Sequence, residues 1–332
     1  MSLARRILLI VYVAFQRSVG TQTEHWMSAR MSYELCVQQP EFQHFCGLSV
    51  EQFNHIYESL GNDAVFKYLK YKENQPTPKK ERKKLLSLRC KLFLTLVRLR
   101  RAFKEKDLAY FMGVSLSTAS RVCKTWIQTL FIQFSLLKPF MMPTVAQQQY
   151  SVPECFKYFK NVRVICDSFE VKCQRPSNFD QNANLYSDYK SACTCKFMVA
   201  VSKRGGIAFV SEAFEGSASD KEIFLKSGSV DFLEPGDAVM VDKGYLIEHE
   251  MNARHIIVYK PPLKKPHQQQ ATGLHTLRTR KIAQARIHVE RIIGKIRRWN
   301  ILNVVIPQTC LYLISQSAFV CSCLTNYEKV DL

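Results

Sequence analysis

The chain has 332 residues, 47 % of them hydrophobic and 23 % charged, which suffices for one large domain or two ordinary ones with a sizeable core. Lys and Arg number 47 against 28 acidic residues, so the formal charge of 47 − 28 = +19 favours a polyanionic partner. The longest apolar run, Ile7–Phe15, is shorter than the roughly 18 to 20 residues that span a bilayer, which excludes a membrane-spanning protein.

The amino terminus has features of a secretory signal. Arg5 and Arg6 precede the apolar run, and the small residues Ser18-Val19-Gly20 follow it. A helix packed on the body of the protein, or a terminus left by the loss of an upstream domain, explains the same residues. The twelve cysteines include no pair with zinc-knuckle spacing, so we expect reduced, mostly buried thiols in an intracellular protein.

Almost all of the net positive charge lies in two stretches. Lys79–Lys124 contains fourteen basic and three acidic residues, a net of +11, and Arg278–Arg298 contains eight basic residues and one acid, a net of +7. This concentration predicts two phosphate-facing surfaces. The alternative is two solvated helical faces that bind no ligand.

A polar segment with two prolines, residues 72–78, is typical of a linker. It is followed by the basic cluster Lys79–Lys84, which serves either as a nuclear localisation signal or as a solvated helix start. A second break is expected at 141–151, where Pro143 and three glutamines interrupt the chain.

The first basic stretch predicts a helix-turn-helix. Apolar residues recur at helical spacing from Leu85 to Val97, which indicates an amphipathic basic helix. In the next segment, small Ala109 allows two helices to cross closely, and Gly113 four residues later provides a tight turn. Either Ser115 or Ser117 then caps a helix over 118–130. A helical hairpin without DNA contacts is the alternative.

The helix at 118–130 is the candidate recognition helix. Its pattern buries Ala119, Val122, Trp126 and Ile127, and it presents polar side chains on the opposite side. The residues expected to contact DNA are Ser117, Thr118, Arg121 and Lys124.

The second half predicts an alternating arrangement of strands and helices with acids at particular positions. A β-branched strand at 162–166 ends at Asp167, and strands at 196–202 and 207–212 form a hairpin. A helix through Leu225 opens at 216–220, and a strand at 237–241 ends at Asp242. A fifth strand follows at 255–259. The long helix at 278–299 carries Glu290 at the edge of its apolar face.

On a helical wheel Glu290 lies close to Arg286 and Arg297, and Gly294 leaves open space one turn beyond the carboxylate. Acids from two strand ends and one helix can converge, and their mutual repulsion then calls for cations such as Mg²⁺ or Mn²⁺. A two-metal carboxylate site suits phosphodiester chemistry. The alternative is that these acids are ordinary surface or helix-capping residues.

The ordered series of motifs resembles a known family. The order strand-Asp, hairpin, helix, strand-Asp, strand, helix-Glu is that of an RNase H-like fold, and the local motifs are similar to those of the DDE superfamily endonucleases of PIF/Harbinger-type transposons. The motifs that carry this resemblance are Ile165–Glu170 with Arg175-Pro176-Ser177, Tyr186–Lys190, Gly216–Asp220, Val241–Tyr245 and Arg286–Gly294. Residues 38–60 also resemble the family's lead-in to its helix-turn-helix.

The resemblance implies an α/β fold, an RNase H-like mixed sheet flanked by helices, which is preceded by an all-α helix-turn-helix domain. The implied divisions are a poorly defined segment at 1–35, a helical lead-in and linker at 36–78, the basic helix-turn-helix at 79–135 and the endonuclease domain at 155–327.

By resemblance, Asp167, Asp242 and Glu290 form a catalytic triad that binds two divalent ions, Mg²⁺ or Mn²⁺. Asp220 is either a further metal ligand or a helix cap, and His288 is expected to be structural. The residues implied to hold DNA phosphate are Lys243, Arg286, Arg291 and Arg297.

The implied protein is a nuclear, metal-dependent nuclease and transposase that acts on double-stranded DNA as a homo-oligomer. Many relatives carry an amino-terminal zinc-binding domain, and no suitable Cys/His set precedes Lys79 here. Three explanations are open: the start is truncated, the helix-turn-helix alone recognises DNA, or a separate DNA-binding partner supplies the recognition. The alternative is a domesticated nuclear protein that keeps the fold and binds DNA without cutting it.

Overall fold

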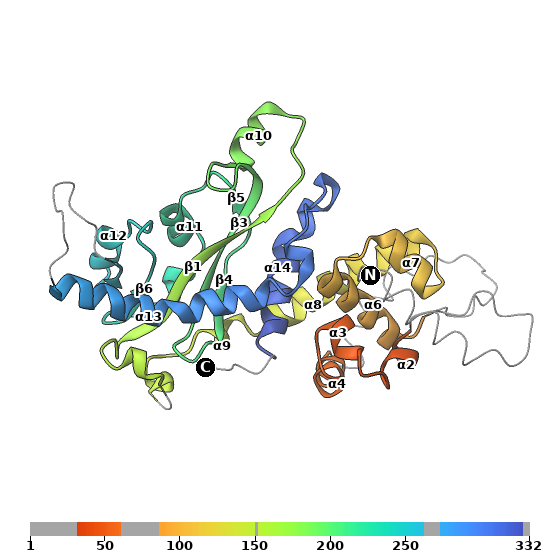
Figure 1. The fold of residues 1–332 in the computed structure, drawn as a ribbon, viewed down its shortest axis with the longest axis horizontal. Coiled ribbons are helices and arrows are strands. Elements are labelled where there is room, and N and C mark those ends of the chain that lie inside the picture. Colours follow the sequence, from red (N-terminus) through yellow and green to blue (C-terminus); the bar gives the residue numbers. More distant parts are fainter. Residues whose placement is uncertain (1–31, 61–85, 150–151, 262–272, 328–332) are drawn as a thin grey trace, which may run out of the picture.

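The computed structural model of the chain describes residues 32–60, 86–149, 152–261 and 273–327 (Figure 1). The expectations for the first 31 residues, the linker at 72–78 and the cluster Lys79–Lys84 lie outside the described residues. No helix in the described ranges is both long and apolar enough to cross a membrane. All twelve cysteines lie in the described residues, and none of them forms a disulfide there.

The first part of the described chain is entirely helical, and its helices α2 to α7 lie at one end of the molecule (Figure 1), whereas α8 and α9 lead from there to the sheet. Serines cap several of its helices: Ser49 caps α4 in a complete capping box with Gln52, and Ser87 caps α6. The helices are α2 (Tyr33–Cys36), α3 (Phe42–Cys46), α4 (Val50–Ser59), α6 (Leu88–Arg101), α7 (Glu105–Met112), α8 (Leu116–Ser135) and α9 (Lys138–Met141).

Helices α7 and α8 form the predicted helix-turn-helix. Gly113 ends α7 with φ +63°, a left-handed conformation that glycine adopts at little cost, and Ser115 caps α8 by accepting from the amide of Thr118 at 3.2 Å. All four residues predicted to be buried on α8 are buried. The turn and the two faces of the recognition helix are therefore confirmed.

Helix α6 departs from the prediction. It was expected to be amphipathic, but apolar residues on nearly every side are buried, because α2, α3, α7, α8 and the 3₁₀ segment Asn300–Leu302 all pack around it. A helix at the centre of a bundle needs no polar face. Its basic residues reach the surface mainly at its ends.

The second part is a mixed sheet with the strand path β4-β3-β1-β6-β7, in which β3 is antiparallel to its neighbours β1 and β4 and the other pairs are parallel. This is the order of an RNase H-like sheet, and two short strands, β2 and β5, also pair antiparallel with β3. The strands are β1 (Val162–Lys172), β2 (Tyr186–Ser187), β3 (Ala192–Val201), β4 (Ile207–Val210), β5 (Phe214–Glu215), β6 (Ala238–Met240) and β7 (Ile257–Tyr259). The predicted β3–β4 hairpin is confirmed.

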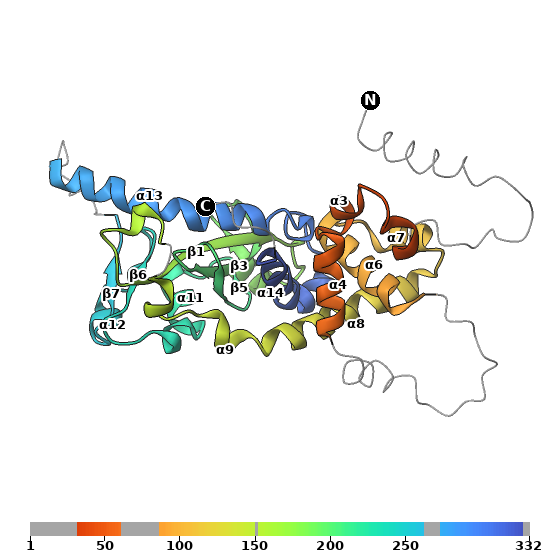
Figure 2. The same cartoon turned by 90° about the horizontal axis from the view of Figure 1, so that it is seen from below.

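Helices cover both faces of the sheet, as Figure 2 shows. Alternate residues of β1 enter two different cores: Ile165 joins the core beneath α13, whereas Val164 and Cys166 join the core beneath α11 and α12. The helices of this part are α10 (Phe179–Leu185), α11 (Asp220–Lys226), α12 (Glu248–Asn252), α13 (Gly273–Ile296) and α14 (Ile314–Thr325).

One continuous core joins the helical part to the sheet. Helix α14 packs on α8, and the fully buried Trp299 lies just beyond α13. The indole N–H of Trp299 donates to Thr325 Oγ1 at 3.1 Å, and the Arg100 guanidinium of α6 lies 5.4 Å from the centre of its ring. The helix-turn-helix and the sheet are thus held together by apolar packing.

Candidate active site

The two predicted aspartates lie at the same level on neighbouring parallel strands. Ile165 of β1 pairs with Met240 of β6, and each aspartate follows two residues later, at Asp167 and Asp242. Ile165 and Met240 both lie in the core beneath α13, so period-two alternation aims both carboxylates at that helix. The register of two buried strands therefore brings these acids together.

The prediction that Asp167 ends its strand was wrong. Strand β1 continues to Lys172, because β3 pairs with it along its length and places Val199 opposite Asp167. Only the parallel neighbour β6 stops at this level, at Met240. The open edge beyond β6, rather than a strand end, exposes Asp167 to α13.

Helix α13 supplies the third acid. Ile282, Ala285 and Val289 are buried on the sheet and fix the rotation of the helix, as predicted. Arg286 and Glu290, one turn apart, then lie at the edge of that apolar face above the two aspartates. The open space predicted at Gly294 is confirmed, since an added Cβ there would meet no atom within 4 Å.

All three carboxylates converge on one guanidinium. Arg286 Nη1 lies 2.8 Å from Asp242 Oδ1, and Nη2 lies 3.9 Å from Asp167 Oδ2 and 4.0 Å from Glu290 Oε1. The side chain of Arg286 is 13 % exposed, whereas that of Glu290 is 60 % exposed. Asp167 is the most buried of the three acids, with 22 % of its side chain exposed, and Asp242 is 47 % exposed, so the cluster opens to solvent at Asp242 and Glu290.

The environment of Asp167 opposes its ionisation. Burial raises the pKa of the Asp167 carboxyl, and the negative charges of Asp242 and Asp220 raise it further. The backbone amide of Ser168, which donates to Oδ1 at 2.8 Å, and the Arg286 guanidinium act in the opposite direction and lower this pKa. The net result of these opposing effects is that the pKa of the Asp167 carboxyl lies above its usual value.

Asp220 lies beside this cluster but has its own cation. It stands in the first turn of α11, where Ser219 rather than Asp220 is the capping residue. Lys196 Nζ of β3 lies 2.9 Å from Asp220 Oδ1, so the carboxylate is paired even though that oxygen is buried. Gly244 packs closely against the other oxygen, and a Cβ there would lie 3.2 Å from it.

Sequence reasoning missed the residues that support the acids. The hydroxyls of Ser168 and Tyr245 are 2.7 Å apart, and each follows a predicted catalytic aspartate closely in the chain. Tyr245 is buried, and this contact ties β1 to the segment after β6. The partner of Asp220, Lys196, was equally missed. Proximity to the acids in the chain was a signal for the first pair, and none existed for the lysine.

The donor set has the right chemistry for a hard divalent cation, because carboxylate oxygens are the usual protein ligands of Mg²⁺ and Mn²⁺. Among the described residues, however, no group of three or more His, Cys, Asp or Glu side chains is already spaced to hold an ion. The three carboxylates are instead arranged around Arg286. The carboxylates are thus ligands of the right type for a divalent cation, but in this structure they are spaced around a guanidinium.

The predicted DNA-contacting residues fall into two groups. On α8, Ser117 and Arg121 are exposed and Thr118 and Lys124 are half-buried, all on the side away from the core. In the sheet domain, Lys243, Arg291 and Arg297 are exposed, with Lys243 next to Asp242 and Arg291 next to Glu290. Arg286 differs from these, because its guanidinium lies on the carboxylates.

Several cations of the first basic stretch are engaged within the protein. Arg89 lies 4.4 Å from the centre of the Tyr57 ring and donates to Asn54, and Arg98 donates to the carbonyl of Phe103. The charge of this stretch therefore overstates its phosphate-facing surface. His288 is buried with Nε2 3.3 Å from Cys155 Sγ, as expected for a structural histidine.

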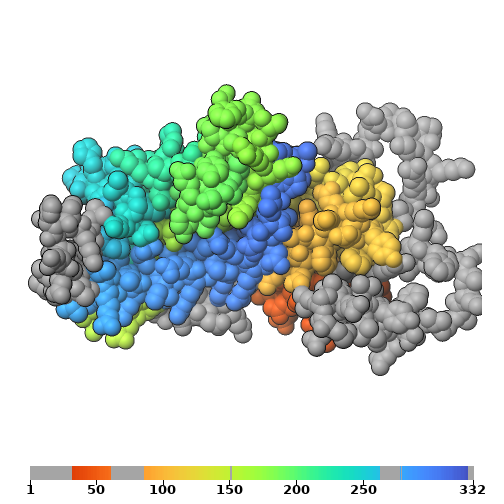
Figure 3. Space-filling model, turned by 45° about the horizontal axis from the view of Figure 1, so that its top comes forward, coloured from red at the N-terminus to blue at the C-terminus, as the bar shows by residue number. Residues whose placement is uncertain are grey.

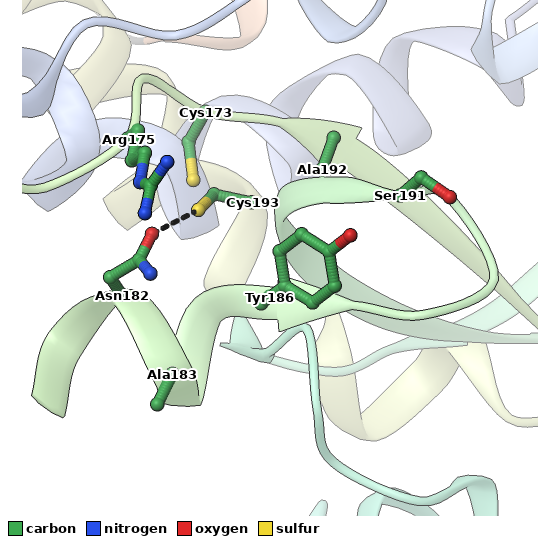
Figure 4. A pocket seen from close by; sticks show the side chains of 8 residues that line it. All are labelled: Cys173, Arg175, Asn182, Ala183, Tyr186, Ser191, Ala192 and Cys193. Carbon is green, nitrogen blue, oxygen red and sulfur yellow. Dashed lines mark hydrogen bonds between the residues drawn. The ribbon is translucent and has the colours of Figure 1, made fainter. Parts of the chain in front are cut away.

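A separate pocket lies beneath α10, in the arm that stands out from the surface beside α13 (Figures 3 and 4). Asn182 and Tyr186 line it, and Cys193 donates to Asn182 Oδ1 at 3.3 Å across it. None of its lining residues belongs to the carboxylate cluster. The acids therefore occupy an open edge of the sheet, distinct from this hollow.

Two family models match separate parts of the chain. Residues 166–326 match the family model described as DDE superfamily endonuclease, and residues 83–136 match the model described as helix-turn-helix of DDE superfamily endonuclease. No curated protein and no solved structure matches the chain.

Proposed function

Because the chain carries a DDE superfamily endonuclease domain and the helix-turn-helix domain of that superfamily, we propose that it is a transposase-type nuclease that cuts and joins DNA phosphodiesters. The observation that carries the proposal is that Asp167 in β1, Asp242 just after β6 and Glu290 on α13 all lie within 4.0 Å of one guanidinium. Three acids from distant parts of the chain meet at an open edge that a DNA backbone can reach.

Asp167, Asp242 and Glu290 are the residues that would hold Mg²⁺ or Mn²⁺, and two ions suit three carboxylates. When bound, such ions lower the pKa of an attacking water or 3′-hydroxyl and stabilise the leaving oxygen. The chain's own contribution is to hold the acids: the Ser168–Tyr245 contact at 2.7 Å ties the strand of Asp167 to the segment of Asp242. Asp220 is a weaker candidate ligand, because Lys196 already balances its charge.

Two exposed surfaces would hold the DNA. The outward side of α8, with Arg121 and Lys124, would enter a groove, whereas Lys243, Arg291 and Arg297 would hold phosphates beside the acids. A nuclear protein that works as a homo-oligomer, with a separate DNA-binding partner, belongs to the same proposal. The resemblance of its motifs to those of PIF/Harbinger-type transposons supports membership of that subgroup as part of the proposal.

Cleavage of supercoiled plasmid in Mn²⁺ tests the proposal. Asp167→Asn and Glu290→Gln should each reduce nicking to below about one hundredth, since even outer-shell changes at metal sites cost 10- to 100-fold. The matched control is Asp231→Asn, which removes a carboxylate that is 78 % exposed and outside the cluster, and should nick like the natural protein. Equal nicking by all forms would refute the assignment of the acids.

A domesticated DNA-binding protein without cleavage activity is the second candidate. The observation in its favour is that Arg286 already lies among the three acids. Such a protein should bind duplex DNA equally well in chelator and in Mn²⁺, with no nicking in either. Both candidates should lose DNA affinity steeply as salt rises, so salt dependence does not separate them.

A further inference from the structure

Arg286 balances only part of the negative charge of the carboxylate cluster. Asp167, Asp242 and Glu290 carry three negative charges, and Arg286 is the only described cation within 4.0 Å of any of them. The positive charge of Arg286 is not needed to balance Asp220, because Lys196 pairs with that acid. The sum of −3 + 1 leaves two negative charges on the cluster.

The contacts of Arg286 are unequal. Only the bond to Asp242, at 2.8 Å, is a full charge-assisted hydrogen bond, whereas the contacts to Asp167 and Glu290, at 3.9 and 4.0 Å, are long. Its Nε atom is buried and has no hydrogen-bond partner. The guanidinium therefore contacts three carboxylates while its own Nε–H donor has no acceptor. A cation that binds these carboxylates better can displace it.

Geometry sets the arginine and a metal ion in competition. Oxygen ligands lie about 2.0 to 2.6 Å from Mg²⁺ or larger hard cations. The acids now stand 2.8 to 4.0 Å from guanidinium nitrogens that lie between them. The carboxylates cannot close around an ion while the guanidinium keeps this place. The backbone of α13 need not move, since a long arginine side chain can turn outwards from a fixed helix.

We propose that Arg286 is a positioning residue that holds Asp167, Asp242 and Glu290 together in the metal-free protein and competes with divalent cations for them. The inference rests on the proposed function, because it takes these acids to be the metal ligands. It assigns Arg286 a role that phosphate binding alone does not require. Metal binding would release its guanidinium at the open side of the cluster.

Mn²⁺ binding to the full-length protein without DNA tests the inference, with free Mn²⁺ measured by electron paramagnetic resonance. Arg286→Gln should bind Mn²⁺ about tenfold more tightly than the natural protein, because one charge-assisted contact no longer opposes the ion. In chelator its Tm should fall by about 2 °C or more, and Mn²⁺ should raise the Tm of the variant more than that of the natural protein.

Two further variants keep the test sharp. Arg280→Gln removes an exposed charge from the same helix and should leave Mn²⁺ affinity unchanged, which separates local competition from a general loss of positive charge. Arg286→Lys keeps the charge but loses the planar fork, and should bind Mn²⁺ more tightly than the natural protein and less tightly than Arg286→Gln. It provides a reading if the glutamine variant does not fold.

The outcomes separate this inference from the proposed function. If the natural protein and both Arg286 variants bind Mn²⁺ equally while Asp167→Asn does not bind it, the metal site stands and the competition is refuted. If Arg286→Gln binds more weakly, the arginine supports the ion and the inference is wrong. If no form binds Mn²⁺, both the metal-dependent function and the inference fail.

Discussion

The packing of Gly47 against Trp299 predicts how tightly the helical part of the molecule is joined to the sheet. Gly47 ends α3 with φ +83°, and a Cβ added there would lie 2.9 Å from Cη2 and 3.2 Å from Cζ3 of Trp299. Trp299 follows the helix that carries Glu290. A substitution at either residue should therefore lower the stability of both the helical part and the sheet.

The magnitudes follow from these contacts. Gly47→Ala should cost about 1–2 kcal/mol for a left-handed non-glycine residue and a further 1–3 kcal/mol, roughly, for the overpacked Cβ. Trp299→Ala should cost about 3–5 kcal/mol, because it empties a fully buried site. The Thr325 hydroxyl would stay partnered, since it also donates to the carbonyl of Cys321 at 2.8 Å.

A double-mutant cycle with Trp299→Phe isolates the contact. Phenylalanine lacks the outer atoms Cη2 and Cζ3, so Gly47→Ala in that background should cost only the backbone strain and the remaining close contact with Arg100 Cδ, 3.1 Å from the added Cβ. The coupling free energy should be about 1–3 kcal/mol, measured by urea unfolding followed by circular dichroism. Phe140→Ala, at a side chain that is 83 % exposed, is the control and should change stability by less than about 0.5 kcal/mol.

Additive costs within about 0.5 kcal/mol would refute the contact. The cycle also tests the joint core, because the two parts should unfold in one transition in every variant. A separate early transition for the helical part would show that the packing of α14 on α8 and of Arg100 on Trp299 does not couple them.

Three further predictions concern DNA binding, the active-site support and the thiols. Lys243→Ala and Arg291→Ala should each reduce the slope of log K for DNA against log salt by about 0.9, because both are proposed to hold phosphates; unchanged slopes in DNA-binding titrations would exclude phosphate contact by these residues. Tyr245→Phe should lower unfolding free energy by about 1 kcal/mol, because the Ser168 hydroxyl loses its 2.7 Å partner; unaltered urea stability would contradict this. Burial raises the pKa of Cys46, Cys123 and Cys323 to about 12, so their thiolates are scarce at pH 8 and the native protein should react slowly with a thiol reagent. Twelve fast-reacting thiols would refute this prediction.

Features that depend on neighbouring residues in the chain were predictable. The turn at Gly113, the cap at Ser115 and the buried side of α8 each follow from a few adjacent residues, and the structure has all three. Helix α6 was misjudged as amphipathic because its burial depends on Trp299 and other partners far away in sequence. Asp167 was misjudged as a strand end because the antiparallel partner β3, rather than the strand's own residues, extends β1 to Lys172.

The positions of the acids could be predicted from the sequence, whereas the position of the guanidinium between them could not. The meeting of Asp167 and Asp242 follows from two apolar runs that each place an aspartate two residues after a buried residue, and parallel pairing turns this local pattern into proximity. The wheel also placed Arg286 one turn from Glu290. The direction of its guanidinium, however, is set by Asp242, 44 residues away, to which it donates at 2.8 Å. A long side chain has many rotamers, and only the assembled charges select one. Sequence therefore indicates which carboxylates meet, whereas their electrostatic balance, and with it the competition between arginine and metal, emerges only from the fold.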